Sequence, residues 1–261
     1  MIRLTFILLI VAHASSAQNF LSWQFKDRYF STTLGTGATT YFGELNHNNS
    51  ISGNLSQINA GIEARLLSRV AARLEATYFT TEGDDRNAPD SSFQRQRNLN
   101  FQSRNFHIQL NALYYLKSYS GDYHSRWVFD PYLFTGIGYL FYNPRTTLGE
   151  EEFSLRSAQT EGVAYNKWAI TIPAGFGLKF KLNEFTNFIF EAGYHFTFTD
   201  YLDDVSSNFA SEFPNGTTEL LSIRKDEIGV VNTTFYDEIQ PGSRGGDSSN
   251  KDAFLQVSLK L

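Results

Sequence analysis

The residues able to carry out acid–base or nucleophilic chemistry are few and scattered. Beyond the first 17 residues the sequence has four histidines, His47, His107, His124 and His195. A catalytic histidine must lie within hydrogen-bond reach of the proton it moves, and on the strand pattern described below these four lie at unrelated heights. Neither a Gly-x-Ser-x-Gly elbow nor a His-Glu-x-x-His helix is present. We therefore expect no enzyme activity, no catalytic residues and no cofactor.

Composition excludes further classes of site. The sequence has no cysteine, which excludes disulfides, thiolate metal sites and cysteine nucleophiles. Its 22 basic and 27 acidic residues give a net charge of −5, whereas a duplex-binding protein carries a basic surface. We expect neither a nucleic-acid partner nor a small-molecule substrate.

Residues 201–248 hold nine acidic and three basic side chains, a charge of −6. Clustered carboxylates are the ligands that hard cations such as Ca²⁺ prefer. The acids here are scattered and lack EF-hand spacing. We therefore predict a solvated outer loop and no metal site.

Six segments alternate apolar with small or polar residues, which is typical of strands with two unlike faces. In residues 168–182 every even position is apolar, while the odd positions are small, polar or Lys. The same pattern holds in residues 58–66, 72–78, 106–114, 188–198 and 253–261. Residues 29–43 and 132–142 are also strand-like but rich in glycine. The sequence therefore predicts eight strands.

The connections decide the architecture. Short links at residues 67–70 and 183–186 and a medium one at 117–127 alternate with long links at 44–54, 83–100, 143–167 and 201–249. An even number of strands, joined by links that alternate between short and long, is typical of outer-membrane barrels, which have short periplasmic turns and long outer loops. The prediction is an all-β, eight-stranded antiparallel up-and-down transmembrane barrel in the cell outer membrane. A soluble lipocalin-like barrel, with the apolar face inward, is the alternative.

The membrane interpretation predicts charges inside the barrel and aromatic rings at both rims. Charged side chains and one histidine project inward on this register: Glu63, Arg65, Arg73, Glu75, Lys179, Lys181, Glu191, His195 and Lys260. Because eight strands leave little interior space, we favour a packed salt-bridge plug over a conducting pore. The rings expected at the interfaces are Tyr29, Phe30, Tyr114, Trp127, Phe129 and Phe188 at one end, and Phe42, Phe79, Phe106, Phe141, Trp168 and Phe198 at the other.

Residues 1–17 have the features of a signal peptide: Arg3, then an apolar stretch, then the small Ser15 and Ala17. We expect residues 18–261 to form the barrel domain. The apolar side chains at the start of that domain (Phe20, Leu21, Trp23 and Phe25) are either an early start of the first strand or a contact for a periplasmic partner or the inner lipid interface.

Four stretches resemble PorG-like proteins of the Bacteroidetes. They are Leu34-Gly-Thr-Gly-Ala-Thr-Thr-Tyr-Phe-Gly-Glu-Leu45, Tyr132-Leu-Phe-Thr-Gly-Ile-Gly-Tyr139 with Asn143-Pro144, Glu191-Ala-Gly-Tyr-His-Phe-Thr-Phe-Thr-Asp-Tyr-Leu-Asp-Asp-Val-Ser206, and Arg244-Gly-Gly-Asp-Ser-Ser-Asn-Lys-Asp252. The third is the most specific, through its Thr199-Asp-Tyr-Leu-Asp-Asp-Val-Ser206 core.

The resemblance implies a structural, non-enzymatic role in the type IX protein secretion system. It implies an outer-membrane barrel associated with a periplasmic ring of proteins resembling PorK and PorN, and it offers no catalytic residues to assign. The alternatives are a generic small outer-membrane barrel for adhesion or envelope integrity, and a narrow ion channel.

Overall fold

The structure is a computed structural model, and it describes residues 28–47, 56–118 and 123–261. The predicted signal segment and the apolar side chains Phe20, Leu21, Trp23 and Phe25 lie outside the described residues, so these interpretations stay predictions. Among the described residues no helix is both long and apolar enough to cross a membrane.

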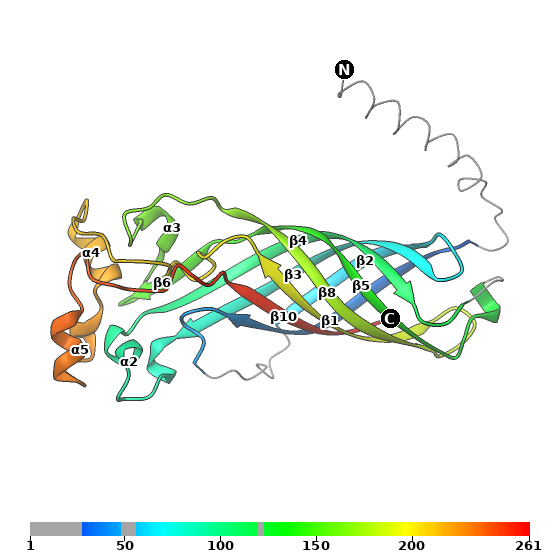
Figure 1. Cartoon of the computed structure of the whole chain (residues 1–261), viewed down its shortest axis with the longest axis horizontal. Coiled ribbons are helices and arrows are strands. Elements are labelled where there is room, and N and C mark those ends of the chain that lie inside the picture. The colour runs from blue at the N-terminus through cyan, green and yellow to red at the C-terminus, as the bar shows by residue number, and fades with distance from the viewer. Residues whose placement is uncertain (1–27, 48–55, 119–122) are drawn as a thin grey trace, which may run out of the picture.

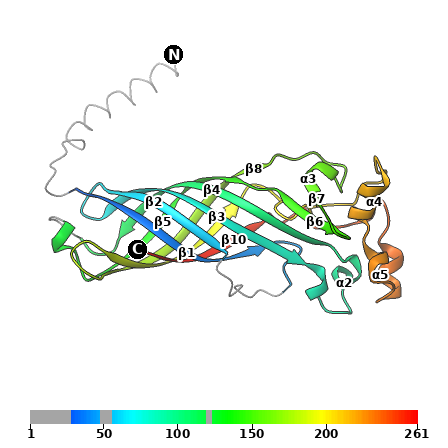
Figure 2. The same ribbon diagram turned by 180° about the vertical axis from the view of Figure 1, so that it is seen from behind.

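Eight long strands close into one antiparallel barrel (Figures 1 and 2). Neighbours in sequence pair with one another, and the ring closes because β1 pairs with β10. The strands are β1 (Phe30–Phe42), β2 (Gln57–Arg65), β3 (Val70–Asp84), β4 (Asn100–Tyr115), β5 (Phe129–Phe141), β8 (Trp168–Lys181), β9 (Asn187–Thr197) and β10 (Ala253–Lys260). All eight predicted strands are confirmed. Closure joins the two edges of the sheet, because Gly35–Phe42 of β1 pair with Ala253–Lys260 of β10.

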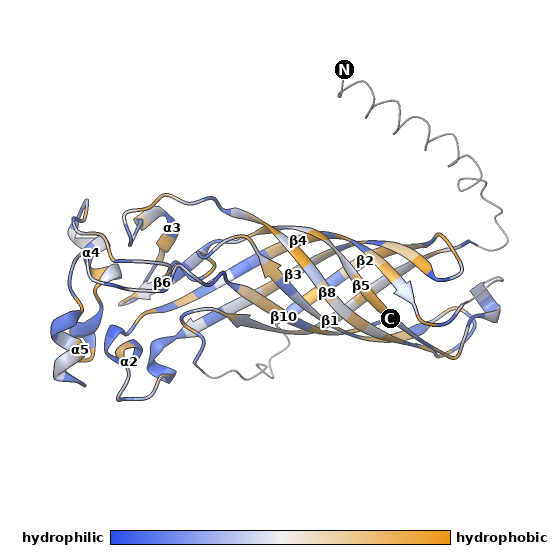
Figure 3. Ribbon diagram, in the orientation of Figure 1, coloured by the Kyte–Doolittle hydropathy of each residue, from blue (hydrophilic) through white to orange (hydrophobic). Residues whose placement is uncertain are grey.

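The two faces of the barrel are divided as the alternation predicts. Ile62 and Leu110 are more than half exposed on the outside, whereas Glu63 and Arg73 are fully buried inside. The apolar strand residues therefore form the outer surface of the wall. Figure 3 shows these hydrophobic residues as orange bands along the strands. The lipocalin-like alternative is wrong, because it requires the apolar face to line the interior.

Two predicted orientations need correction. Phe79 is buried inside the barrel against Phe254, with ring centroids 5.0 Å apart; it falls on the inward parity of β3, one residue after the outward Tyr78. Lys181 lies at the barrel rim, where its ammonium donates to the His124 carbonyl. The other aromatic residues predicted for the rims include well-exposed rings at both ends, such as Phe30, Trp127, Trp168 and Phe198.

The two ends of the barrel are unlike. The turn end holds the links 66–69 and 182–186 and the described parts of the β4–β5 link, 116–118 and 123–128 with η2 (Tyr123–Ser125). The loop end carries the remaining elements (Figure 1): η1 (Asp85–Asn87), α2 (Phe93–Arg97), the hairpin of β6 (Pro144–Leu148) and β7 (Glu151–Ser154), α3 (Leu155–Ala158), α4 (Gly216–Ser222), η3 (Lys225–Glu227) and α5 (Thr233–Glu238). The hairpin continues the sheet at the loop end of β4.

The loop end is a folded cap rather than a set of solvated loops. Buried Leu202, Val205 and Phe209 from the last loop pack in one core with Leu45 and Leu99. The prediction that residues 201–248 form a solvated loop is therefore wrong for their first part. The apolar partners that bury this segment come from other loops far away in the sequence.

Candidate functional site

The middle of the lumen is filled by six charged side chains that neutralise one another. Three are carboxylates, Glu63, Glu75 and Glu191, and three are bases, Arg73, Lys179 and Lys260, all buried. We call this set the ionic plug. Strand register places Glu63 of β2 directly opposite Arg73 of β3. On β10, Ser258 lies opposite Glu191 of β9, and Lys260, two residues further along β10, reaches Glu191 with its ammonium.

Arg73 is at the centre of the ionic plug. Its guanidinium donates to Glu191 at 2.5 Å and to Glu63 at 3.0 and 3.3 Å. Lys179 contacts Glu63 at 2.8 Å, while Lys260 contacts Glu75 and Glu191 at 2.6 Å each. Buried charges are tolerated only when they are paired and hydrogen-bonded, and here every one is paired.

Two tyrosine hydroxyls complete the ionic plug. Tyr115 donates to Glu63 and Tyr132 donates to Glu191, both at 2.5 Å. Glycines make room for these rings: a Cβ on Gly177 would lie 2.1 Å from the Tyr132 ring. The geometry of these contacts agrees with the predicted salt-bridge plug. Glycines such as Gly177 lie on the strands where a large neighbouring side chain occupies the space that a Cβ would need.

Towards the loop end, the next lumen layer is aromatic. The rings of His107 and His195 lie 5.3 Å apart, and His195 stacks on Phe254 at 4.5 Å. The prediction that the histidines lie at unrelated heights is wrong for this pair. His107 also contacts the Thr171 hydroxyl at 2.8 Å, but all of these side chains are buried, so a substrate has no access to them.

The cap begins where three of the family-like stretches meet. The Asp247 amide donates to Glu44, and the Leu202 amide donates to Asp252. Tyr41 donates its hydroxyl to Asp203. The sequence resemblance therefore marks segments that pack together at the loop end.

Four carboxylates, Glu44, Asp200, Asp203 and Asp252, gather at this junction, and we call them the acidic cluster. Burial raises the pKa of Glu44 to about 8 and that of Asp203 to about 7, and the negative charge of Asp203 contributes to the shift at Glu44. Burial and the nearby charges of Asp203 and Glu44 also raise the pKa of Asp252. Burial likewise raises the pKa of Asp200.

Two further buried acids have defined partners in the cap. Asp204, at a left-handed φ of 73°, accepts hydrogen bonds from Tyr165 at 2.5 Å and from Thr160. Burial raises its pKa to about 7. Asp85 instead pairs with Arg97 at 2.7 Å, and although burial opposes ionisation, Arg97 lowers the pKa of this carboxyl.

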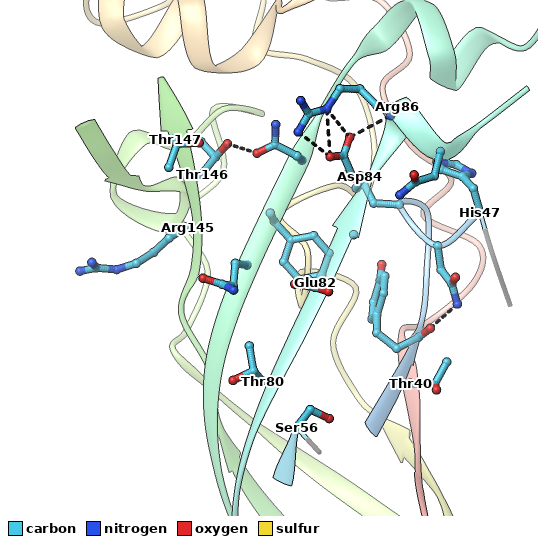
Figure 4. Close-up of a pocket in the computed structure, with 18 of the residues that line it drawn as sticks. Thr40, His47, Ser56, Thr80, Glu82, Asp84, Arg86, Arg145, Thr146 and Thr147 are labelled. Carbon is cyan, nitrogen blue, oxygen red and sulfur yellow. Dashed lines mark hydrogen bonds and ion pairs between the residues drawn. The ribbon is translucent and has the colours of Figure 1, made fainter. Parts of the chain in front are cut away.

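A cavity of about 690 Å³ opens beside the cap, between the loop ends of β1, β3 and β4 and the strand β6 (Figure 4). Thr80 and Glu82 of β3 lie on one side, and Arg145 and Thr147 of β6 lie on the other. Asp84 and Arg86 pair with each other at 2.7 Å. The lining is polar and mixed in charge, with no nucleophile–base pair among its described residues.

The sequence predicted the charged residues of the ionic plug, but it did not predict the folded cap. The inward charges lie on regular strands, so local alternation located them. Glu44 follows β1, Asp200 follows β9 and Asp252 precedes β10. Because β9, β10 and β1 are adjacent antiparallel strands, the strand order alone could have predicted that these three residues lie at the same end of the barrel. The predicted acidic loop, by contrast, contributes only Asp203 to the cluster.

A family model described as "Domain of unknown function (DUF6089)" matches residues 9–215. The chain belongs to this family. The match takes in Glu44, the Thr199–Ser206 motif and the strands β1 to β9, while Asp252 and β10 lie beyond it. No curated protein matches the chain.

Solved structures of outer-membrane barrels are similar to the DUF6089 chain in fold. A major outer membrane protein from Thermus thermophilus is 13% identical with a TM-score of 0.44, over 90% of this chain and 98% of that one. The N-terminal β-barrel domain of Pseudomonas aeruginosa OprF is 11% identical with a TM-score of 0.35, over 90% and 98%. Yersinia pestis Ail is 9% identical with a TM-score of 0.34, over 90% and 99%.

Proposed function

We propose that this chain is a non-enzymatic structural barrel of the outer membrane. In hydrocarbon every backbone donor and acceptor must be paired internally, and a closed ring of eight paired strands is suited to this condition. The exposed apolar wall and the rim aromatics are suited to lipid. In this orientation the turn end faces the periplasm and the cap faces outward.

The observation that carries the structural role is the ionic plug. Side chains from β2, β3, β8, β9 and β10 fill the lumen at one level, with three positive and three negative charges in direct contact. A lumen filled in this way gives neither a substrate path nor a binding site. The chain is therefore better suited to hold other components than to conduct or react.

We further propose that the barrel belongs to the type IX protein secretion system and associates with a periplasmic ring of proteins resembling PorK and PorN. The sequence resemblance supports this role. The turn end offers exposed apolar side chains for such a contact: Phe185 at the β8–β9 turn is 74% exposed and Leu67 at the β2–β3 turn is 41% exposed. Exposed apolar groups at one end of a membrane protein fit a protein contact beyond the lipid.

Site-specific cross-linking tests this proposal. A photoreactive amino acid at position 185 should capture the ring lipoprotein in intact outer membranes. The matched control is the same group at position 163, because Val163 is 43% exposed but lies at the loop end. Deletion of the gene should abolish export of the secreted proteins. Normal export together with no capture at either position would refute the assignment to this secretion system.

A second candidate is a small barrel for adhesion or envelope integrity. The folded cap favours it, because Leu220, Val230 and Val231 are exposed around α4 and η3. A deletion strain separates the two functions: altered surface binding with normal export would support this alternative. A narrow ion channel predicts single-channel conductance in planar bilayers, which the ionic plug argues against.

A further inference from the structure

Three carboxylates from three chain segments converge at the loop end. Glu44 follows β1, Asp200 follows β9 and Asp252 precedes β10. One carboxylate oxygen of each lies within 4.8 Å of the others. Because β9, β10 and β1 are neighbours in the barrel, the fold itself brings these positions together.

Each carboxylate is oriented through one of its oxygens. The Leu202 amide donates to Asp252 Oδ2 at 2.8 Å, and Ser206 Oγ donates to Asp200 Oδ2 at 2.7 Å. A longer contact of 3.3 Å joins the Asp247 amide to Glu44 Oε1. These bonds fix the carboxylates. The second oxygen of Asp252, Oδ1, lies 3.3 Å from the Tyr41 hydroxyl, whereas Asp200 Oδ1 accepts no hydrogen bond from the described residues.

Asp200 supplies an independent sign of a missing partner. The residue is only 2% exposed, and its Oδ1 is buried without any hydrogen bond among the described residues. A buried carboxylate oxygen left without a donor is costly. Its other oxygen is already used by Ser206, so Oδ1 is the atom left to take up a ligand.

Within residues 28–47, 56–118 and 123–261, positive charge near the three carboxylates is insufficient to balance them. The Lys251 ammonium lies 4.0 Å from Asp200, and its side chain is 55% exposed. Arg97 approaches the Glu44 backbone carbonyl, but its guanidinium pairs with Asp85. The fourth acid of the cluster, Asp203, adds negative charge and accepts from Tyr41 and the Val205 amide.

We propose that Glu44, Asp200 and Asp252 bind a hard divalent cation, with Ca²⁺ preferred. Carboxylate oxygens are the ligands of such ions, and Ca²⁺ accepts flexible sets of oxygens at about 2.3–2.6 Å, so two of its ligands can be about 5 Å apart. Mg²⁺ needs a tighter octahedron at about 2.0–2.1 Å and usually keeps several waters. The bound ion joins the exits of β1 and β9 to the entry of β10 and thereby fixes the cap to the barrel.

Titration with the metal alone tests the site. Purified full-length protein in lipid nanodiscs should bind Ca²⁺ saturably in calorimetry. Tb³⁺ should show luminescence sensitised by Tyr41, whose hydroxyl lies 3.3 Å from Asp252 Oδ1. Asp252→Asn and Asp200→Asn should each weaken binding at least tenfold. Asp237→Asn, at an exposed acid of α5, is the matched control and should bind as the unaltered chain does.

A second measurement separates loss of the ligand from loss of the fold. With chelator present, Asp200→Asn should give a cap at least as protected from hydrogen exchange as the unaltered cap, because one repulsive charge is gone. Added Ca²⁺ should raise protection in the unaltered chain and leave this variant unchanged. Equal protection of the unaltered chain with Ca²⁺ and with chelator, or equal weakening by Asp237→Asn, would overturn the proposal.

Discussion

Replacing Arg73 by Met tests whether the lumen is a packed ionic plug. The substitution keeps a long side chain in the same space while removing the guanidinium that contacts Glu63 and Glu191. Three carboxylates then share two ammonium groups, so the interior carries one uncompensated negative charge. We expect the barrel to be destabilised strongly.

The expected loss in the free energy of unfolding depends on which ion pairs Glu63 and Glu191 lose and which they retain. Breaking a buried ion pair by removing one partner costs about 3–5 kcal/mol. Glu63 still has Lys179 at 2.8 Å, and Glu191 still has Lys260 at 2.6 Å. Because neither carboxylate is left wholly without a cation, we expect a loss near the lower limit, about 3 kcal/mol in the free energy of unfolding.

Urea unfolding in lipid vesicles, followed by tryptophan fluorescence and by the gel shift of folded barrels, measures this loss. Arg69→Met is the control, because Arg69 is exposed in the β2–β3 turn and should change the free energy of unfolding by no more than about 0.5 kcal/mol. The double variant Arg73→Met/Glu191→Gln removes one charge of each sign and should recover part of the loss through coupling of about 0.5–3 kcal/mol. An Arg73→Met barrel as stable as Arg69→Met would refute the plug, because it would mean that water screens these charges.

Three other predictions follow from the wall, the cap and the lumen. Leu110→Lys places a charge on the exposed apolar wall, which the proposed function places in lipid, and should cost about 2–4 kcal/mol in vesicles, whereas Val163→Lys in the loop end should have little effect on urea unfolding. The folded cap holds a proton on Asp204 up to a pH of about 7, and an unfolded Asp releases it near about 3.9. Raising the pH from about 5 to about 8 without divalent cations should therefore lower protection of residues 199–210 from hydrogen exchange, and Asp204→Asn should remove its share of that pH dependence. Gly138→Ala introduces a Cβ 2.1 Å from a buried histidine ring and should cost about 1–3 kcal/mol by overpacking, while Gly216→Ala, with nothing within 4 Å, should leave the urea midpoint unchanged.

The barrel could be predicted from the sequence because its rules are local. Each strand reveals its two faces by alternation, so Glu63 and Arg73 could be placed inside without knowing their partners. The predicted orientation was wrong for single residues at which residue type and strand alternation indicated different positions. Phe79 was predicted at the rim because it is aromatic, but its parity directs it inward, and the packed lumen buries it.

The cap could not be predicted because its contacts are not local. Leu45 and Leu99 bury Val205 only after β1, β3, β4 and β9 have paired. The meeting of His107 with His195 likewise depends on two strands on different parts of the ring. Periodicity gives the face of a residue but not which other strand lies across the lumen from it.

The cap also gives the Thr199–Ser206 motif a physical purpose. Leu202 and Val205 enter the cap core, while Asp200, Asp203 and Asp204 are buried in hydrogen-bonded positions. A segment buried to this extent closes the barrel and cannot at the same time present these side chains to a partner. In this chain the motif is therefore part of the cap at the loop end of the barrel. Any contact with the proposed periplasmic ring must be made by other residues, at the turn end, so variants of the motif should alter the cap and variants at Phe185 should alter the contact.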